Sequence, residues 1–334
     1  MKTNLIFLFF FFFLLASPMM GVLPYTVMFY NVENYFDCVD DTTTQDNDFL
    51  PEGIKKWSAY RMAVKRTNIA RVIAAVGQGS APVLVGLCEV ENDELLRQLV
   101  RYKPLSSLRY EYVHYESPDM RGIDVALLYQ PTCFTPLHSR AIPICLSDGK
   151  PTRDVLYVKG LLSGSDTLHV LVCHAPSRRG GDEASAWRRA EAMTSVKNVI
   201  DSVLRLQVDA SVLLMGDFND TPQDSSMCKV LGAKPYRSSA DTLTLHNLMV
   251  GDKGTYKYKS EWSLFDQFVV SKSLLKGGGF VVENQRAYVY DARFLLQTDN
   301  TYMGYKPYRT YLGPRYVGGF SDHLPIYLRL QPVH

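Results

Sequence analysis

The chain has 334 residues, of which 46% are hydrophobic and 12% aromatic, so it can bury a sizeable core and is not disordered. Its 36 Lys and Arg residues nearly balance its 34 Asp and Glu residues, giving a formal charge of +2. This balance excludes a protein that binds polyanions through a strong overall positive field, and any such binding must be local.

The N-terminal segment MKTNLIFLFFFFFLLASPMMG, residues 1–21, is typical of a secretory signal peptide. It begins with a cation at Lys2, continues with an apolar run from Leu5 to Leu15, and ends in small and turn-forming residues. The apolar run is short for a membrane span, which needs roughly 20 residues. We therefore expect an exported protein, periplasmic or extracellular, with no stable membrane insertion after cleavage. An uncleaved N-terminal anchor is the alternative.

Seven short runs rich in Val, Leu, Tyr and Phe follow this segment and predict strands that are largely buried. In chain order they read YTVMFYN, PVLVGLCE, IDVALLY, LHVLVCH, SVLLMGD, LFDQFVV and LPIYLRL. Helical periodicity occurs between some of them, at residues 57–76 and 184–206. Loops and hairpins join the other strands, so the pattern predicts a mixed α/β fold rather than a strict alternation of strands and helices.

No internal repeat, low-complexity tract or linker divides the chain, so we expect a single domain over residues 22–334 and a monomer. The polar, acidic stretch at residues 33–52 predicts a solvated loop, since its spacing does not match an EF-hand. Six widely spaced cysteines do not form a disulfide scaffold. Cys88 and Cys173 stand in apolar runs and are expected to be buried thiols. A bridge between Cys133 and Cys145 is the pairing that the sequence leaves open.

Polar side chains occur where several of the predicted strands end. Asn31, Glu89, His174 and Asp217 each close an apolar run. One such residue ordinarily marks only where a strand leaves the core. The repetition predicts instead that the strand ends converge on one edge of facing sheets.

The side chains gathered there are rich in oxygen and poor in nitrogen and sulfur. Such a set suits Mg²⁺ or Mn²⁺ better than zinc, whose structural sites use thiolates and imidazoles, and Ca²⁺ is a further alternative. The sequence contains no HExxH, paired CxxC, Walker-type loop or GxSxG that would compete for the assignment. We therefore expect a site for a divalent cation.

Two pairs of residues carry the expected chemistry. Asp217 and Asn219 share a face if the strand stays extended to its end, and they would place a carboxylate and an amide at one ligand. Asp322 stands beside His323, whose imidazole titrates near neutral pH. A carboxylate that orients water, an amide that holds an anionic oxygen and an imidazole together suit a phosphate ester.

These motifs resemble those of the endonuclease/exonuclease/phosphatase superfamily, whose fold is that of DNase I. The resemblance covers nearly all of the chain after the signal, and GDFN with a distant SDH is its most specific part. It implies a four-layer α/β sandwich, with two mainly antiparallel sheets face to face and flanked by helices. The matching segments, in the family's order, are FYNVEN, LVGLCEVEN, RGIDVALLY, VCHAPSRRGG, LLMGDFND, FDQFVVS and GFSDHLPI.

The resemblance places Asn31, Glu89 and Asp322 at the metal, with Glu89 as the principal carboxylate ligand. Glu91 would share a strand face with Glu89, but the family's motif points to Glu89. Whether one or two ions bind stays open.

The resemblance also implies catalytic roles. His174 would contact the scissile phosphate, Asp217 would position or activate the attacking water, and Asn219 would orient the water or the phosphate. Asp266 would hydrogen-bond to His323. Whether Asp217 or His323 is the general base stays open, because coupled groups titrate together.

Arginines near these motifs are the predicted substrate contacts, because one guanidinium group can donate two hydrogen bonds to the oxygens of a phosphate. Arg121 and Arg178 lie in or beside matched motifs, and Arg179 is a less favoured third. The stretch YMGYKPYRTYLGPRYVGGF interleaves tyrosines with basic residues, a combination that stacks bases and holds phosphates, and its Arg309 is a further candidate. The alternatives are solvated loops and ordinary loop packing.

The sequence thus predicts an exported, metal-dependent phosphodiesterase, with nucleic acid as the first expected substrate. The small net charge and the acidic stretch after Asn31 argue against a long duplex. A phosphomonoesterase or a sphingomyelinase-like phospholipase of the same superfamily is the main alternative. A non-catalytic binding module is less favoured, because every metal, base and phosphate position that we can match is retained.

Overall fold

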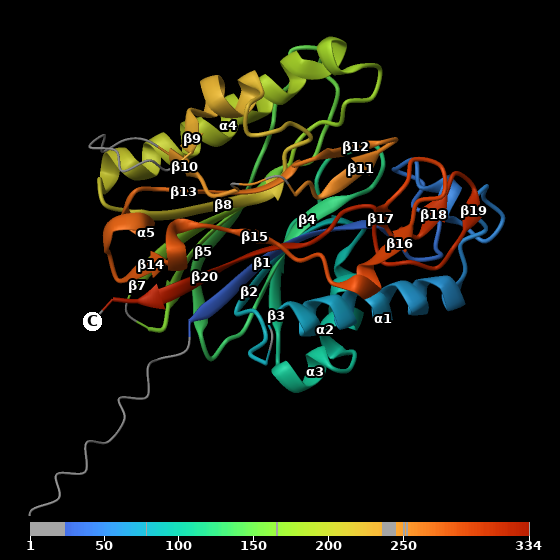
Figure 1. Cartoon of the computed structure of the whole chain (residues 1–334), viewed down its shortest axis with the longest axis horizontal. Coiled ribbons are helices and arrows are strands. Elements are labelled where there is room, and N and C mark those ends of the chain that lie inside the picture. The colour runs from blue at the N-terminus through green and yellow to red at the C-terminus, as the bar shows by residue number, and fades with distance from the viewer. Residues whose placement is uncertain are drawn as a thin grey trace, which may run out of the picture.

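Two seven-stranded β-sheets pack face to face in the centre of the computed structural model, and helices cover their outer faces (Figure 1). Antiparallel pairs are in the majority in both sheets, but the first sheet also contains one parallel pair and the second sheet two. The predicted four-layer α/β sandwich is confirmed. The structure describes residues 24–77, 79–164, 166–235, 245–249, 251 and 253–333. The expected signal peptide lies outside the described residues.

The first sheet contains the N-terminal and C-terminal strands of the fold side by side. Strands β1 and β2 are parallel neighbours, and the other pairs in this sheet are antiparallel. In spatial order its strands are β14 (Phe280–Val282), β20 (Ile326–Pro332), β1 (Tyr25–Tyr35), β2 (Leu84–Val90), β4 (Asp124–Tyr129) and β3 (Glu111–His114), with β15 (Tyr288–Val289) also paired to β20.

The second sheet repeats this arrangement, with β7 and β8 as parallel central neighbours. In spatial order its strands are β5 (Phe134–Ile142), β6 (Val155–Leu162), β7 (Asp166–His174), β8 (Ser211–Asp217), β13 (Asp266–Val270), β10 (Leu245–Asn247) and β9 (Ala233–Pro235). All seven predicted strands are therefore present among the strands of the two sheets.

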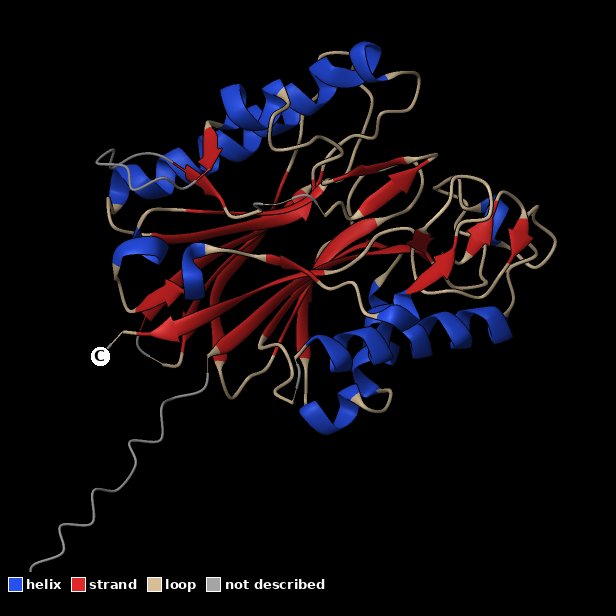
Figure 2. Ribbon diagram, in the orientation of Figure 1, coloured by secondary structure: helices blue, strands red, loops and turns tan. Residues whose placement is uncertain are grey.

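Three small hairpins lie beyond one end of the sandwich, where they flank the strand ends (Figure 2). Their strands are β11 (Tyr256–Tyr258) with β12 (Glu261–Ser263), β16 (Leu296–Thr298) with β17 (Tyr305–Pro307), and β18 (Tyr311–Leu312) with β19 (Arg315–Tyr316).

The helices form the outer layers. Helices α1 and α2 cover the first sheet, α4 covers the second, and α3 and α5 are single turns. Within the described residues, no helix is both long and apolar enough to cross a bilayer. The bounds are α1 (Ala59–Val76), α2 (Asp93–Arg101), α3 (Leu105–Leu108), α4 (Asp182–Leu206), α5 (Ser273–Lys276), and the short turns η1 (Asn47–Phe49), η2 (Ser226–Leu231), η3 (Glu283–Gln285) and η4 (Arg293–Leu295).

Both sheets are buried on both faces, which explains why their strands read as unbroken apolar runs. In β1, Val27 and Phe29 pack in the core between the sheets, whereas Met28 and Tyr30 pack in the core that includes α1 and α2. This alternation follows the two-residue period of a strand. Layers on both sides therefore hold the central strands rigidly.

The predicted helices begin close to where the structure places them. Helix α1 starts at Ala59, after the side chain of Ser58 accepts a hydrogen bond from the backbone of Arg61 as an N-cap. Trp57, expected in the helix, is instead buried beside Tyr311 in a small aromatic cluster. Helix α4 begins at Asp182, two residues before the predicted start.

Two expectations need correction. The stretch at residues 33–52 is not wholly a solvated loop, because β1 continues to Tyr35 and both Glu33 and Asp46 are buried. The bridge between Cys133 and Cys145 is wrong, and all six cysteines are free. Strand β5 separates that pair by roughly 30 Å, far beyond disulfide reach. The buried thiols expected at Cys88 and Cys173 are confirmed.

Candidate active site

Parallel pairing brings the predicted strand-end residues together. Asn31 and Glu89 lie where the regular parallel pairing of β1 with β2 ends, although β1 itself continues to Tyr35, and His174 and Asp217 are register partners at the ends of β7 and β8. Because parallel strands end at the same edge of a sheet, each pair presents its side chains together. The two sheets meet here, since the side chain of Asn31 donates a 3.0 Å hydrogen bond to Asp217 Oδ2.

A cavity of about 620 Å³ opens at this edge. Tyr256 and Tyr258 of the β11–β12 hairpin form part of its wall. Asn31 and Asp266 do not line it but are buried beside residues that do. The predicted site residues that line the cavity are Glu89, Arg121, His174, Arg178, Arg179, Asp217, Asn219, Asp322 and His323.

The carboxylate of Asp217 lies between two imidazoles. Its Oδ2 is 3.7 Å from His174 Nε2 and 3.7 Å from His323 Nε2. Burial and the neighbouring Asp266 carboxylate raise the pKa of Asp217 to about 6, against the opposing effect of His323. Asp217 thus has a pKa suited to exchanging a proton near neutral pH.

His323 forms a buried pair with Asp266, in which His323 Nδ1 lies 2.7 Å from Asp266 Oδ2. Burial alone would lower the pKa of His323, but the carboxylates of Asp266 and Asp217 together raise it well above its ordinary value. The ring of Tyr256 packs 5.0 Å from the imidazole. At neutral pH the pair is therefore an imidazolium held by a carboxylate.

His174 has the opposite electrostatic environment. Burial lowers its pKa well below the ordinary value, and the guanidinium groups of Arg153 and Arg121 lower it further. Its Nδ1 is buried with no hydrogen-bond partner among the described residues. His174 is consequently a neutral imidazole beside the charged His323.

A β-bulge directs Glu89 towards the cavity. The register of β2 against β4 shifts between Cys88 and Val90, and Glu89 adopts a left-handed φ of 63°, which is unusual for a residue other than glycine. Its Oε2 accepts a 2.9 Å hydrogen bond from the backbone of Asn34. The bulge also breaks the alternation that would have put Glu91 on the same face, and Glu91 binds the backbone of Asp37 instead.

Asn219 reaches the cavity by a route that differs from the expected extended strand. Strand β8 ends at Asp217, and Asn219 has a left-handed φ of 51°. Its backbone N–H donates to Asp217 Oδ1 at 3.0 Å, and its side-chain amide donates to the carbonyl of Ala175 at 3.1 Å. A turn, not strand alternation, thus brings Asp217 and Asn219 together, while Phe218 packs into the core under α4.

The donor atoms at the cavity fit a hard divalent cation. Glu89 and Asp217 line the same cavity with carboxylate oxygens, and Mg²⁺ is ordinarily held by one or two carboxylates together with water and substrate phosphate. Asp217, Asp266 and His323 also have ligand atoms within 4.8 Å of one another. In that group the short contact between His323 and Asp266 is that of a proton-sharing pair. A divalent ion would therefore be held on the Glu89 side of the cavity, by the carboxylates of Glu89 and Asp217.

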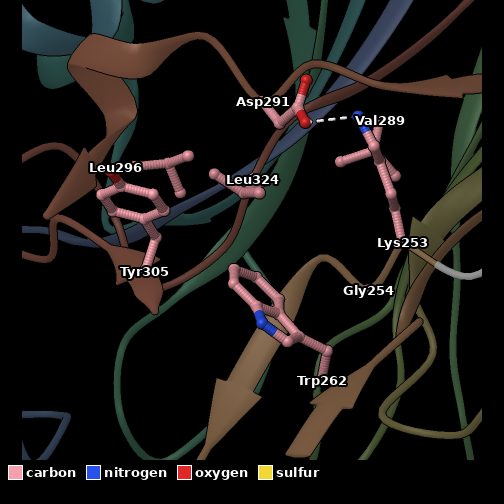
Figure 3. A pocket seen from close by; sticks show the side chains of 8 residues that line it. All are labelled: Lys253, Gly254, Trp262, Val289, Asp291, Leu296, Tyr305 and Leu324. Atoms are coloured by element: carbon pink, nitrogen blue, oxygen red, sulfur yellow. Dashed lines mark hydrogen bonds and ion pairs between the residues drawn. The ribbon is translucent and has the colours of Figure 1, made fainter. Parts of the chain in front are cut away.

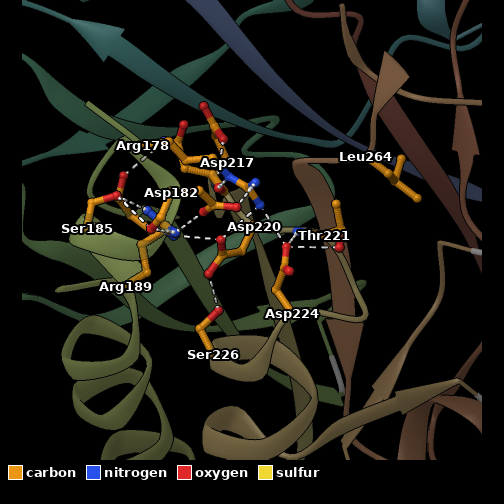
Figure 4. A network of polar contacts seen from close by, with 12 residues as sticks. Arg178, Asp182, Ser185, Arg189, Asp217, Asp220, Thr221, Asp224, Ser226 and Leu264 are labelled. Carbon is orange, nitrogen blue, oxygen red and sulfur yellow. Dashed lines mark hydrogen bonds and ion pairs between the residues drawn. The ribbon is translucent and has the colours of Figure 1, made fainter. Parts of the chain in front are cut away.

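Two of the predicted substrate-binding arginines are held by several partners. Arg178 donates to the carbonyl of Asn219 and pairs with Asp182, Asp220 and Asp224 (Figure 4). It therefore anchors the loop after β8 while lining the cavity. The same network includes Arg189 of α4, which is buried and lies 2.6 Å from both Asp182 and Asp220.

Arg309 does not line the cavity. It lies 2.7 Å from Asp322 and 3.4 Å from Glu33, so its guanidinium neutralises two carboxylates. Arg121 donates to the side chain of Asn34 at 2.7 Å and is 3.7 Å from Glu89.

Arg179 differs from these three arginines. It is exposed at the mouth of the cavity, and among the described residues no hydrogen-bond or ion-pair partner holds its side chain. The arginine that the sequence ranks last is thus the one whose guanidinium is free to meet a ligand.

Sequence reasoning missed the β11–β12 hairpin, whose two faces line different cavities. Tyr256 and Tyr258 face the catalytic cavity, whereas Trp262 on the other face lines a separate pocket of about 280 Å³ with Lys253 and Tyr305 (Figure 3). The alternation in YKY and EWS, separated by a polar turn, was the available signal for a hairpin. No predicted site residue lines the second pocket.

The fold and the site define a phosphoesterase of the DNase I type. The sequence pattern of the endonuclease/exonuclease/phosphatase family matches residues 26–332, so the chain belongs to this family and is a phosphate-ester hydrolase. A search of curated proteins found no match.

Solved structures share the fold over nearly the whole chain. A member of the same family from Bacteroides thetaiotaomicron is 17% identical, with a TM-score of 0.58 over 92% of this chain and 97% of that one. A mannosyl-6-phosphatase of the same organism gives 17% identity and a TM-score of 0.58 over 92% and 99%. Danio rerio TDP2, solved with a single-strand DNA product, gives 15% identity and a TM-score of 0.56 over 92% and 98%. At these identities the likeness concerns the fold.

Proposed function

We propose that the protein is an exported phosphodiesterase that requires a divalent cation, Mg²⁺ or Mn²⁺. The substrate that we propose for it is nucleic acid. The observation that carries this proposal is the position of Asp217 between a neutral and a charged imidazole, beside Glu89. Water attack on phosphorus needs a proton acceptor, a group that meets the developing charge and a group that serves the leaving oxygen. In this proposal Asp217, His174 and His323 fill these three roles in turn.

Each role falls to a particular side chain. Asp217 accepts the proton of the attacking water, because its pKa of about 6 leaves it ionised yet basic at neutral pH. His174 donates a hydrogen bond to a nonbridging phosphoryl oxygen. His323, kept charged by Asp266, neutralises and protonates the leaving oxygen. Asn219 holds the water or the phosphate. A bound cation supplies charge neutralisation at the phosphate oxygens.

The cavity size and the charge distribution favour small or single-stranded substrates. A cavity of about 620 Å³ walled by the β11–β12 hairpin accommodates a nucleotide-sized group. Binding a long duplex would require many free cations, whereas Arg121 and Arg178 at the cavity are already paired with carboxylates. The proteins of similar fold include a TDP2 solved with a single-strand DNA product and a mannosyl-6-phosphatase, so monoesters remain the alternative substrate class.

A substrate panel tests the proposal. Purified protein in EDTA, Mg²⁺ or Mn²⁺ is offered single-stranded DNA, RNA, plasmid, an aryl phosphodiester, an aryl phosphomonoester and sphingomyelin. We expect metal-dependent cleavage of diesters, fastest on single strands. Hydrolysis of monoesters alone would change the assignment to a phosphatase, and hydrolysis of sphingomyelin alone to a phospholipase. Loss of all turnover with every metal would refute the proposal.

Export is a separate part of the proposal and rests on residues 1–21. Fractionation of cells that express the full chain tests it. We expect the protein outside the cytoplasm with residues 1–21 removed, and a full-length cytoplasmic product would contradict export.

A further inference from the structure

The loop that carries Asp322 and His323 is fastened to helix α1 by two polar side chains. Lys65 Nζ donates hydrogen bonds to Thr310 Oγ1 at 2.6 Å and to the carbonyl of Phe320 at 2.7 Å. The side-chain amide of Asn68 donates to the carbonyl of Gly319 at 2.9 Å and, more weakly, to that of Gly318 at 3.3 Å. Lys65 and Asn68 stand three residues apart, so they share one face of the helix.

The two acceptors of Lys65 lie on chain segments that cross each other closely. The backbone N–H of Gly319 donates to the carbonyl of Arg309, and that of Phe320 donates to the carbonyl of Tyr308. A Cβ atom at Gly319 would lie 2.1 Å from the Tyr308 carbonyl oxygen and 2.3 Å from that of Arg309, so only glycine permits the crossing. The Lys65 ammonium bridges both segments at this point.

The crossing leads directly into the catalytic residues. Ser321 Oγ donates to the carbonyl of Asn31 at 2.7 Å and accepts from the backbone of His323 at 3.1 Å. Arg309, on the other segment, pairs with Asp322 at 2.7 Å. A shift of either segment therefore displaces Asp322 and His323 relative to the strand ends.

Burying an ammonium group in this space costs free energy, because the charge loses its hydration. Lys65 is only 1% exposed, and an apolar side chain of similar volume would pack there without losing hydration. Burial lowers the pKa of Lys65 to about 8, while the carboxylates of Glu33 and Asp322 oppose that shift. What an apolar side chain could not supply is a pair of directional hydrogen bonds that hold Thr310 and Phe320 in register.

We propose that Lys65 is a positioning residue for the proposed hydrolysis: its ammonium fixes the crossing of residues 308–310 with 318–320, and thereby sets the position of His323 relative to Asp217. Lys65 touches neither substrate nor the reacting atoms. It acts through the loop, and Asn68 supports it from the same helix face. The inference rests on the proposed function, since it concerns turnover at that site.

The test compares Lys65→Met with wild type. Methionine keeps nearly the same volume and removes both hydrogen bonds. We expect kcat on an aryl phosphodiester to fall by about thirtyfold to a hundredfold with KM within about threefold, because a misplaced catalytic group slows chemistry more than it weakens binding. Lys197→Met is the matched control: Lys197 is a half-exposed helical lysine paired with Asp201 on α4, and its replacement should leave kcat unchanged.

A second measurement separates positioning from stability. In metal-free protein, the Nδ1 proton of His323 should give a low-field NMR signal through its bond to Asp266, and Lys65→Met should shift or broaden it below the unfolding temperature. A variant that is less stable but keeps wild-type kcat and this signal would overturn the inference. If Lys65→Met does not fold, Asn68→Ala removes two hydrogen bonds without touching a buried charge. It should lower kcat about fivefold, and an unchanged kcat there would also overturn it.

The two proposals fail in distinguishable ways. Absence of turnover in wild type would refute the proposed function, while the NMR comparison would still report whether Lys65 orders the loop. Turnover in wild type with no change in either variant would refute the role of Lys65 alone.

Discussion

Different helices, through different kinds of contact, position the two halves of the catalytic cavity. Helix α4 supports the loop after β8, and helix α1 supports the segment that leads to His323. On the α4 side, Arg178 and Arg189 both pair with Asp220, which also accepts a hydrogen bond from Ser226. On the α1 side, a single ammonium at Lys65 bridges the two segments that lead to His323. Asp220 keeps a charged partner when either arginine is lost, whereas on the α1 side the side chain that supports Lys65 is the uncharged Asn68.

This difference has an energetic consequence. Removing one arginine on the α4 side leaves Asp220 with a charged partner, so the loop that presents Asn219 keeps its anchor. Removing the ammonium on the α1 side leaves two acceptors without their shared donor. Stability and catalysis should therefore respond differently to mutations on the two sides.

The largest effect should come from Asp217, which contacts both halves. Its Oδ1 binds the backbone of Asn219, and its Oδ2 binds the side chain of Asn31. Asp217→Asn should lower kcat by about a thousandfold or more while the protein stays folded, because the variant lacks the proposed proton acceptor. Steady-state kinetics with circular dichroism check this, and a rate within tenfold of wild type would contradict the assigned role.

Arg189→Met tests the anchor on the α4 side directly. Arg189 is 1% exposed, and its loss should lower the free energy of unfolding by about 2–3 kcal/mol, because Asp182 and Asp220 each lose a buried counter-charge. Urea denaturation measures this change. The kcat of the folded fraction should stay within threefold of wild type, since Arg178 still holds Asp220. A loss of kcat equal to that expected for Lys65→Met would show that the two sides are held alike.

Glu91 provides a contrast to both anchors, since no cation pairs with it among the described residues. Burial, together with nearby Asp37 and Asp46, raises its pKa from 4.5 to about 8, against the opposing effect of the hydrogen bond from the Asp37 backbone. Its stabilising contribution is thus fully present below pH 4.5 and is lost as pH rises to about 8. Glu91→Gln should be more stable than wild type at pH 8 by about 1–2 kcal/mol and equal to it at pH 4. If the free energy of unfolding had the same pH dependence in wild type and in Glu91→Gln, that result would contradict a buried Glu91 carboxyl group without a cationic partner.

The smallest effect concerns Arg179, which belongs to neither anchor. Arg179→Gln should raise KM for a single-stranded oligonucleotide about fivefold, as expected for the loss of one exposed charge contact. Arg205→Gln, at the far end of α4, is the control and should leave KM unchanged. If Arg179→Gln and Arg205→Gln had the same KM, the Arg179 guanidinium would not contact the substrate.

The strands and the residues at their ends were readable from the sequence because burial on both faces leaves an unbroken apolar signal. The first polar residue after such a run, as at Asn31, Glu89, His174 and Asp217, marks the edge where the regular pairing of the parallel strands ends. The apolar run of β20, directly after His323, marked the last of these segments in the same way.

The partners of the charged side chains could not be predicted, because they come from distant parts of the chain. Arg309 pairs with Glu33, 276 residues away, and the acidic composition around Glu33 suggested a solvated loop. The backbone at Glu89 and Asn219 is likewise set by a bulge and a turn that the tertiary structure imposes on residues other than glycine. Lys65 reads in the sequence as one more cation on a helix, and only the fold shows that it is buried.

The most direct measurement is turnover of an aryl phosphodiester by wild type and by His323→Ala, each freed of metal and then titrated with Mg²⁺. We predict no turnover before Mg²⁺, restoration in wild type, and a His323→Ala rate lower by about a thousandfold at saturating metal. Full activity in EDTA, or a His323→Ala rate close to wild type, would contradict a metal-dependent phosphodiesterase centred on Asp217 and His323.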